Sequence, residues 1–355
     1  MIAVAGGPRE RGRAYGERAR DRVHRSLELY EELFRHRTGM RWPAVRDRVG
    51  AFADPIEAYD VRLLPEIEGI AEGAAVDAED VLALNVRTEV MFGMGSGECT
   101  ALCTRSGPEE DAHVLLAQNW DWHPRARDTC VILAAAPHDA PAFVTFVEAG
   151  LLAKCGMNDR GLGVVTNALT STLDRGTPGV PYHAILRRIL TSASFDEAVG
   201  AVVDPPRAAS ANYLVASGDG RAAEIEAAPG DRDQVHRVEG ERLAHANHFL
   251  RPSRPGSKDL ERIDPSSTSV ARQARAERFL SAAAASIDEL LEALRDHDAP
   301  ICRHADPNAP PAEANETIAS VAMDLTEGAW WVTGGRPCTV APERSELASL
   351  VAPAA

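Results

Sequence analysis

Apolar residues in the first ninety positions recur at intervals of three and four, the spacing of one face of an α-helix. Residues 10–37 carry this pattern and predict an amphipathic helix, and Pro43 is placed to begin the next one. Residues 63–90 predict two further helices, the second starting at Asp77 with Asp80 in a capping-box position. The N-terminal part of the chain is therefore predicted to be helical.

The pattern changes at residue 99, where short runs of Val, Thr, Leu and aromatic residues begin to alternate with Gly, Pro or acidic clusters. Such runs predict β-strands joined by hairpins. A turn over residues 157–161 leads into a further apolar run at 162–169. We therefore expect a group of strands between residue 99 and residue 169.

Helices and strands then follow each other as blocks. Two helices are predicted over residues 181–203, with Ser194 capping the second, and more helices over 266–297. Hairpins are predicted over 211–230 and 316–338. Separate blocks of helices and antiparallel hairpins predict an α+β layered fold and not a series of βαβ units.

The composition of the 355-residue chain fits one large domain or two ordinary ones with a substantial core. The net charge of −15 leaves no concentrated basic face, which argues against nucleic acid or an anionic membrane as a partner. No apolar run approaches a membrane span and the N-terminus lacks a signal-peptide pattern, so we expect a cytoplasmic protein. Six cysteines do not make a disulfide framework in a chain this long.

Familiar catalytic and metal-binding motifs do not account for the cysteines. The stretch 93–98 lacks the flanking glycines of a nucleophile elbow, and no P-loop or dinucleotide-binding fingerprint occurs. Cys99 and Cys103, with His245 and His248, have a spacing just compatible with zinc. Residues four apart on a strand are far from each other, however, and residues three apart face opposite sides, so we expect no metal site.

Cys99 begins a predicted strand directly after the glycine-rich stretch Gly95-Ser96-Gly97. Taken alone, such a cysteine is more often a buried core residue than a nucleophile. A nucleophilic thiol needs a base or a positive charge that lowers its pKa. If the peptide bond before Cys99 were cut, the new α-amino group, with a reference pKa of roughly 7.7–8.0, would sit beside the thiol as that base.

Six stretches of the chain occur in a characteristic order: ECTALC, LLAQNWDW, GMNDRGLGVVTNAL, NYLVASGDGRAAEIEAAPG, HANHF and ASVAMDLTEGAWWVTGGRPC. In this order they resemble the acyl-coenzyme A:6-aminopenicillanic acid acyltransferase (isopenicillin N acyltransferase-like) family. The opening GGPRERGRAYGERAR also resembles that family's N-terminal signature, so the resemblance covers nearly the whole chain.

The resemblance implies a four-layer αββα sandwich of two antiparallel sheets, the fold of N-terminal nucleophile (Ntn) hydrolases. It also implies a proenzyme that cleaves itself just before the cysteine. Residues 1–98 would then form a helical N-terminal segment, either a pro-region or a small subunit, and residues 99–355 the catalytic domain.

Carried over residue by residue, the resemblance places the nucleophile at Cys99 and the scissile bond between Glu98 and Cys99. The family's founding enzyme has glycine before its cysteine, so Glu98 is a departure that bears on the rate of cleavage. The aspartate of the QNWD motif falls on Asp121, and the asparagine of the H-x-N-H motif on Asn247. Related penicillin V acylases and bile salt hydrolases carry an oxyanion-hole asparagine after a similar turn, which corresponds to Asn167.

These residue types suit acyl transfer through a covalent intermediate. The Cys99 thiol attacks the Glu98 carbonyl, water resolves the resulting thioester, and the freed α-amine becomes the base for attack on an amide or thioester. Asp121 would hold the ammonium, while Asn247 and Asn167 would donate hydrogen bonds to the oxyanion. The acyl group would then pass to water or to an amine.

The expected substrates are small acyl-amides, peptide-like amides, acyl-coenzyme A or biosynthetic intermediates of secondary metabolism, and penicillin specificity is not inherited from the founding enzyme. No cofactor is expected, with acyl-coenzyme A entering only as an acyl donor. The two cleavage fragments are expected to remain partners of each other. Monomeric and homo-oligomeric states both stay open.

Two other interpretations stay open as well. An uncleaved cysteine hydrolase would be active as an intact chain and would hold a histidine within hydrogen-bond reach of the thiol. A non-catalytic relative would use its acidic surface as a binding module. The joint presence of Cys99, Asp121 and Asn247 argues against that second interpretation.

Several other residues fit structural roles better than chemical ones. We expect Cys103, Trp120 and Trp122 to pack in the core, and the two histidines of the HANH stretch to be hydrogen-bonded structural residues. His123 and Arg303 are weaker candidates for contact with a substrate.

Overall fold

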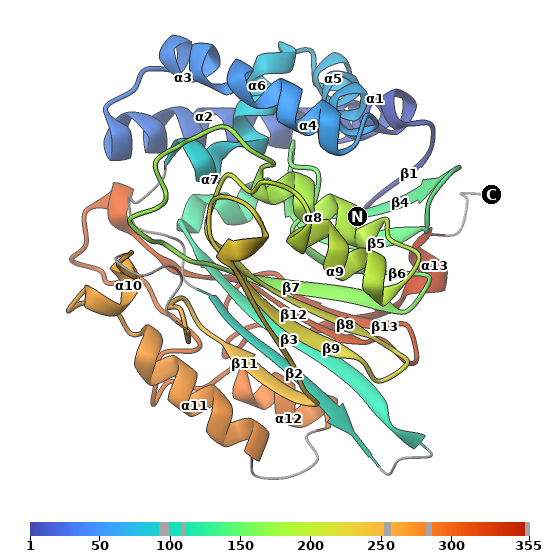
Figure 1. Ribbon diagram of the computed structural model, residues 1–355, viewed down its shortest axis with the longest axis vertical. Helices are drawn as coiled ribbons and strands as arrows, with labels where there is room; N and C mark the ends of the chain where they lie inside the picture. The colour runs from blue at the N-terminus through green and yellow to red at the C-terminus, as the bar shows by residue number, and fades with distance from the viewer. Residues whose placement is uncertain (92–98, 108–110, 252–256, 282–285, 352–355) are drawn as a thin grey trace.

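The computed structural model describes residues 1–91, 99–107, 111–251, 257–281 and 286–351. Its N-terminal part is helical, as predicted, and caps the rest of the molecule (Figure 1). The helix predicted over 10–37 is divided at Ala19, and the capping box of Asp77 and Asp80 is confirmed. The helices of this part are α1 (Pro8–Arg18), α2 (Arg20–Thr38), α3 (Trp42–Val49), α4 (Ala53–Tyr59), α5 (Leu63–Ala74), α6 (Ala78–Asn85) and α7 (Arg87–Val90).

Two β-sheets form the middle of the molecule, and they contain the hairpins that the sequence predicted. The larger sheet has the order β1-β4-β5-β6-β7-β8-β9-β10 and the smaller one the order β11-β2-β3-β12-β13-β14. The larger sheet contains β1 (Ile2–Gly6), β4 (Cys130–Pro137), β5 (Phe143–Glu148), β6 (Cys155–Asn158), β7 (Leu162–Ala168), β8 (Ala211–Ser217), β9 (Ala222–Ala227) and β10 (Val235–Glu239). The smaller sheet contains β2 (Cys99–Ser106), β3 (His113–Trp122), β11 (Arg242–His245), β12 (Glu316–Asp324), β13 (Ala329–Thr333) and β14 (Glu343–Glu346).

Helices cover the outer face of each sheet. The pair α8 (Tyr182–Leu190) and α9 (Phe195–Val203) packs on the larger sheet, and the pair α11 (Ser269–Ser281) and α12 (Ile287–Ala293) packs on the smaller one (Figure 1). The short helices α10 (Leu260–Ile263) and α13 (Leu347–Val351) flank them. Among the described helices, none combines the length and the apolar composition that a bilayer crossing requires.

The hydrophobic core follows the same layers. Leu116 of the smaller sheet and Val164 of the larger sheet belong to one buried cluster between the two sheets. A second cluster joins Leu102 of the smaller sheet to Leu280 of α11 and Leu290 of α12. The predicted four-layer αββα arrangement is therefore confirmed, because each sheet buries one face on the other and the second face under helices.

The first strand differs from what the sequence predicted. Residues Ile2–Gly6 form β1, which pairs in parallel with β4 at the edge of the larger sheet, so the N-terminal segment is not only helical and this sheet is not wholly antiparallel. Five residues are too few for their alternation to stand out from the helical pattern that follows. The N-terminal segment thus contributes a strand to the sandwich that it caps.

Four glycines bring α1 and α5 unusually close together. Gly12 and Gly16 on α1 meet the backbone of α5, and Gly69 and Gly73 on α5 meet the backbone of α1. A Cβ atom at any of the four would fall inside van der Waals distance of a carbonyl oxygen on the other helix. We call these four glycines the glycine seam.

Candidate active site

Cys99 is the first residue of β2, an interior strand of the smaller sheet, where it pairs with Trp120 of β3. Its side chain is buried, with 2% of the residue exposed. Cys103, on the same strand, is also buried, and burial raises the pKa of its thiol to about 12. Cys103 is therefore a core residue, as predicted.

Three polar side chains hold the backbone of Cys99. The Cys99 N–H donates to Oδ1 of Asn247 at 2.8 Å. The Cys99 carbonyl accepts hydrogen bonds from Nδ2 of Asn167 at 3.2 Å and from Nη1 of Arg272 at 2.6 Å. Arg272 also donates through Nη2 to Oδ1 of Asn247 at 3.0 Å. The structure therefore brings Cys99, Asn167 and Asn247 together and adds Arg272 to them.

The amide groups of the two asparagines are engaged with the backbone. Nδ2 of Asn247 donates to the Ala168 carbonyl at 2.9 Å. Nδ2 of Asn167 donates to the His245 carbonyl at 2.9 Å in addition to that of Cys99. An oxyanion role for Asn167 stays a prediction, and it requires one of these two bonds to open when a substrate binds.

Asp121 lies on β3 one residue past Trp120 and is completely buried. Its Oδ1 accepts a hydrogen bond from Oγ1 of Thr317 at 2.6 Å, and its Oδ2 lies 4.0 Å from Nε of Arg303. Burial raises the pKa of the nearby Cys99 thiol, the Asp121 carboxylate raises it further, and a hydrogen bond from the Asp121 backbone N–H acts against both by favouring the thiolate. The predicted aspartate is thus adjacent to the predicted nucleophile.

Lys154, which sits between the end of β5 and β6, supplies a buried positive charge to this region. Its Nζ lies 4.3 Å from the centre of the Trp120 ring. Burial raises the pKa of the Cys99 thiol, and the Lys154 ammonium acts against burial by stabilising the thiolate. Burial in turn lowers the pKa of Lys154, so the two groups share one desolvated environment.

The histidines that the sequence analysis singled out have other partners. His245 contacts Oε1 of Glu226 through Nε2 at 2.9 Å, and His248 contacts Oγ of Ser269 through Nδ1 at 2.8 Å. His123 contacts the Pro311 carbonyl at 2.9 Å. The prediction that His245 and His248 are hydrogen-bonded structural residues is confirmed. Trp120 and Trp122 are likewise buried and packed, as predicted.

Sequence reasoning missed three residues of this site: Arg272, Lys154 and Thr317. Lys154 carried a usable signal, because it is one of only two lysines and interrupts an otherwise apolar run. Arg272 looks like any polar residue of an amphipathic helix until the helix is placed against the sheet. Thr317 has no signal beyond its position in a predicted strand, because its role depends on which strand pairs with β3.

Residues 107–338 match the model of the family described as acyl-coenzyme A:6-aminopenicillanic acid acyl-transferase. This match spans more than half of the chain. The chain belongs to this family. Asp121, Asn167 and Asn247 lie inside the matched region, and Cys99 lies just before it.

One curated relative in this acyltransferase family is the acyl-coenzyme A:6-aminopenicillanic-acid-acyltransferase 40 kDa form of Emericella nidulans. It is 27% identical over 281 residues, which cover 79% of this chain and 77% of the relative. The descriptions of the family and of this relative both name acyl transfer.

Two solved structures also resemble the fold. Penicillin V acylase from Agrobacterium tumefaciens gives a TM-score of 0.43 at 15% identity, over 66% of this chain and 83% of that one. A mutant of the conjugated bile acid hydrolase from Clostridium perfringens gives a TM-score of 0.45 at 13% identity, over 71% of this chain and 94% of that one.

The predicted scissile bond includes Glu98, which lies outside the described residues. The division into a segment 1–98 and a catalytic domain 99–355 accordingly stays a prediction.

Proposed function

We propose that this family member is a cysteine enzyme of the N-terminal nucleophile type, which cleaves the bond before Cys99 and then transfers acyl groups through an acyl-Cys99 intermediate. The observation that carries the proposal is the 2.8 Å hydrogen bond from the Cys99 nitrogen to Oδ1 of Asn247. In the intact chain this nitrogen belongs to the peptide bond with Glu98. A free α-amine in a buried site needs a polar side chain as its hydrogen-bond partner, and Asn247 is directed at this nitrogen.

The cleavage step moves an acyl group from nitrogen to sulfur. The Cys99 thiolate attacks the Glu98 carbonyl carbon, a C–S bond forms, and the C–N bond breaks while the nitrogen takes up the proton that the thiol gave up. Water then hydrolyses the thioester, which leaves a carboxylate on Glu98, a free thiol and a free α-amine on Cys99. Lys154 supports the attack because its charge stabilises the thiolate.

In the mature enzyme the Cys99 α-amine accepts the thiol proton, and the thiolate attacks the acyl carbon of the substrate. Asn247 orients the α-amine through Oδ1, and we assign its Nδ2 group, which also donates to the Ala168 carbonyl, to the oxyanion. Asp121, which Thr317 and Arg303 orient, stabilises the α-ammonium until the leaving group takes the proton. Asn167 and Arg272 fix the Cys99 carbonyl, so the nucleophile keeps one position throughout.

We assign acyl-amides and acyl-thioesters as the substrate class, because both present the carbonyl that a thiolate attacks. The name of the Emericella nidulans relative supports an acyl-coenzyme A donor and an amine acceptor. Water and amines compete for the same acyl-Cys99, and exclusion of water decides between hydrolysis and transfer.

Intact-mass spectrometry of the purified protein tests the cleavage. We expect two polypeptides, residues 1–98 and 99–355, from the wild type and a single chain from Cys99→Ala. Cys103→Ala is the matched control, because it removes a buried thiol from the same strand and should still be cleaved.

An uncut wild-type chain that hydrolyses acyl-amides would contradict the α-amine base and favour a histidine-based cysteine hydrolase. An uncut chain without activity on acyl-amides or acyl-coenzyme A plus amines would contradict the whole proposal and favour the binding module.

A further inference from the structure

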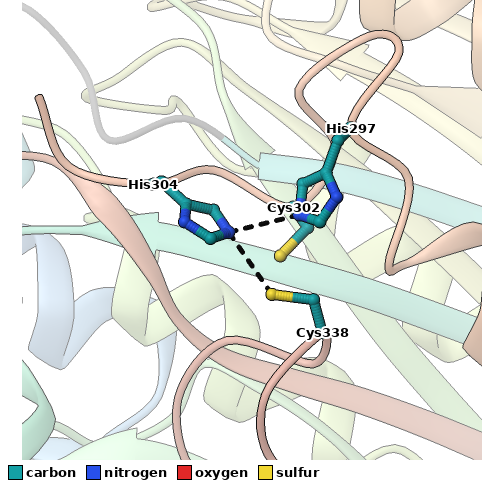
Figure 2. Close-up of side chains that lie close together, drawn as sticks. All are labelled: His297, Cys302, His304 and Cys338. Carbon is teal, nitrogen blue, oxygen red and sulfur yellow. Dashed lines mark hydrogen bonds between the residues drawn. The ribbon is translucent and has the colours of Figure 1, made fainter.

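Four side chains with metal-binding atoms, none of them among the residues assigned above, converge in one group (Figure 2). They are His297, Cys302, His304 and Cys338, and their ligand atoms all lie within 4.8 Å of one another. The first three come from the segment between α12 and β12, and Cys338 comes from the segment that follows β13. Residues 34 positions apart in sequence, at 304 and 338, thus meet in space.

We propose that His297, Cys302, His304 and Cys338 bind a zinc ion as a tetrahedral structural site. Two thiolates and two imidazoles are the ligand set of many structural zinc sites, and two nitrogen and two sulfur ligands in a tetrahedron favour zinc over magnesium or calcium, which prefer oxygen. The expectation from sequence was that the chain has no metal site, and this proposal replaces it.

The distances suit a zinc ion at the centre of the group. Bonds of about 2.0–2.3 Å to a tetrahedral zinc place its ligand atoms about 3.3–3.8 Å from one another. Nε2 of His304 lies 3.2 Å from Nε2 of His297 and 3.3 Å from Sγ of Cys338 (Figure 2). The remaining pairs of ligand atoms lie within 4.8 Å of one another.

The way the rings face each other also supports a metal. Nε2 of His297 faces Nε2 of His304, and two neutral imidazoles in this arrangement share one proton in one hydrogen bond. The Cys338 thiol contacts the same nitrogen of His304. A metal ion satisfies all of these lone pairs at once. On binding, the two thiols release their protons to solvent, and two Zn–S bonds and two Zn–N bonds form.

One present contact has to change when the metal binds. Nη1 of Arg336 lies 3.1 Å from Nδ1 of His304, and that nitrogen carries the ring proton once Nε2 is coordinated. Glu316, whose Oε2 lies 3.9 Å from Nη1 of Arg336, is placed to take over the guanidinium.

The site is half open to solvent. Cys302 is buried, Cys338 is half-buried, and the two histidines are exposed. A metal can therefore enter from solution, while four protein ligands leave no position for a substrate or a reacting water. These features indicate a structural site and not a catalytic one.

The metal would fix a segment that has little regular structure of its own. Residues 294–310 connect α12 to the short turn at Pro311–Glu313 without a helix or strand. Arg303 lies between two of the ligands, its N–H donates to Oγ1 of Thr317 at 2.9 Å, and Thr317 in turn donates to Asp121. The zinc site would thus hold the orientation of Asp121 through Arg303 and Thr317. This last step rests on the proposed function, but the metal site itself does not.

Metal analysis of the full-length protein tests the proposal. The protein is purified without chelators, or incubated with ZnCl₂ under reducing conditions and desalted, and its zinc content is measured by mass spectrometry. We expect about one zinc per chain, and a loss of at least tenfold in both Cys302→Ser/Cys338→Ser and His297→Ala/His304→Ala. Cys130→Ser is the control, because it changes a buried cysteine of β4 outside the group and should keep the zinc.

Replacement of zinc by Co²⁺ gives a second readout that does not depend on activity. We expect visible absorption of tetrahedral cobalt with thiolate charge-transfer bands, and we expect it to disappear in the Cys302/Cys338 variant. Circular dichroism of each variant shows whether it is folded. If a double variant unfolds, the single Cys302→His variant takes its place in the measurement, because it keeps four metal ligands.

Three results would overturn the proposal: no zinc or cobalt bound by the folded reduced protein, zinc retained by all of the folded variants, or a Cys302–Cys338 disulfide that persists under the reducing conditions. Loss of self-cleavage with zinc still bound would concern only the proposed function and would leave the zinc site intact.

Discussion

At Cys99, burial and a neighbouring charge act on the thiol in opposite directions. Burial raises its pKa, which alone would make it inert, and the Lys154 ammonium lowers it. The carboxylate of Asp121 raises the pKa further, and the Asp121 N–H lowers it. The reactivity of the thiol therefore depends on whether Lys154 keeps its charge.

We predict that Lys154→Met moves the pH profile of the Cys99 reaction to higher pH. Without the ammonium, the thiol pKa rises further, so the thiolate fraction falls at every pH below it. A rise of one pKa unit lowers the rate about tenfold on the acidic limb. The pH dependence of self-cleavage, and of Cys99 alkylation by iodoacetamide, measures this shift.

Lys258→Met is the matched control, since Lys258 is the other lysine of the chain and is exposed. Its pH profile should coincide with that of the wild type. A Lys154→Met enzyme with a lower rate but an unshifted profile would mean that Lys154 acts only through packing.

The residues of the site differ in how visible they are in the sequence. Asp121 and Asn247 sit in short motifs that could be matched to a family, and the structure places both next to Cys99. Arg272 and Thr317 lie in ordinary helix and strand patterns. Their roles depend on the packing of α11 and β12 against β2 and β3, which no local pattern encodes.

Among the elements, α1 and α5 pack backbone against backbone because the glycine seam lets them approach. Glycine inside a helix is normally unfavourable by about 1 kcal/mol relative to alanine. Four such positions on two facing helices therefore indicate that close packing outweighs helix propensity here.

We predict that Gly16→Ala destabilises the protein by at least about 2 kcal/mol, although alanine is the better helix former. The added methyl group has to push against the Ile70 carbonyl and separate the two helices. Chemical denaturation of the variant and the wild type measures the change in free energy of unfolding.

Gly200→Ala in α9 is the control for helix propensity. Its methyl group would meet only the movable Asp204 side chain at 3.2 Å, so this variant should be neutral or slightly stabilising. Equal effects of the two substitutions would show that close packing at the glycine seam is unimportant.

Most helices and hairpins were predictable because their apolar periodicity is strong, as in α2 and the β8–β9 hairpin. The missed strand β1 has only five residues, and its partner β4 lies more than a hundred residues away in sequence. The metal-binding group escaped for the same reason, since its last ligand, Cys338, is on a different segment from the others. The pattern of apolar positions does not show which short segments meet when they lie far apart in the sequence.

For the molecule as a whole, the N-terminal segment is joined to the sandwich by buried polar contacts. Glu66 of α5 pairs with Arg11 of α1 at 2.9 Å and with Arg187 of α8. Tyr30 of α2 donates to Glu148 of β5 at 2.8 Å, and Arg87 of α7 pairs with the same carboxylate. All of these side chains are buried, so separation of the segment would leave charges without partners.

We predict that the two proposed fragments stay together after cleavage and elute as one 38.1 kDa particle, or a multiple of it, until denaturant unfolds both. Glu148→Gln leaves Arg87 without its buried carboxylate and should destabilise this assembly by about 3 kcal/mol. Size-exclusion chromatography and guanidinium titration measure the two effects.

Glu68→Gln is the control, because it breaks an exposed pair with Arg9 and should leave the denaturation midpoint unchanged. Fragments that elute separately from the wild type in native buffer would contradict the buried connection.

The proposed cleavage changes the role of the parallel pairing of β1 with β4. The bond cut at Cys99 turns an intramolecular strand pair into one between two polypeptides, so the shorter fragment becomes a donor strand for the larger sheet. A polypeptide produced from residue 99 onward alone would expose the open hydrogen-bonding edge of β4, a template for self-association. The segment that precedes the nucleophile would then serve the mature enzyme as its permanent protection against aggregation.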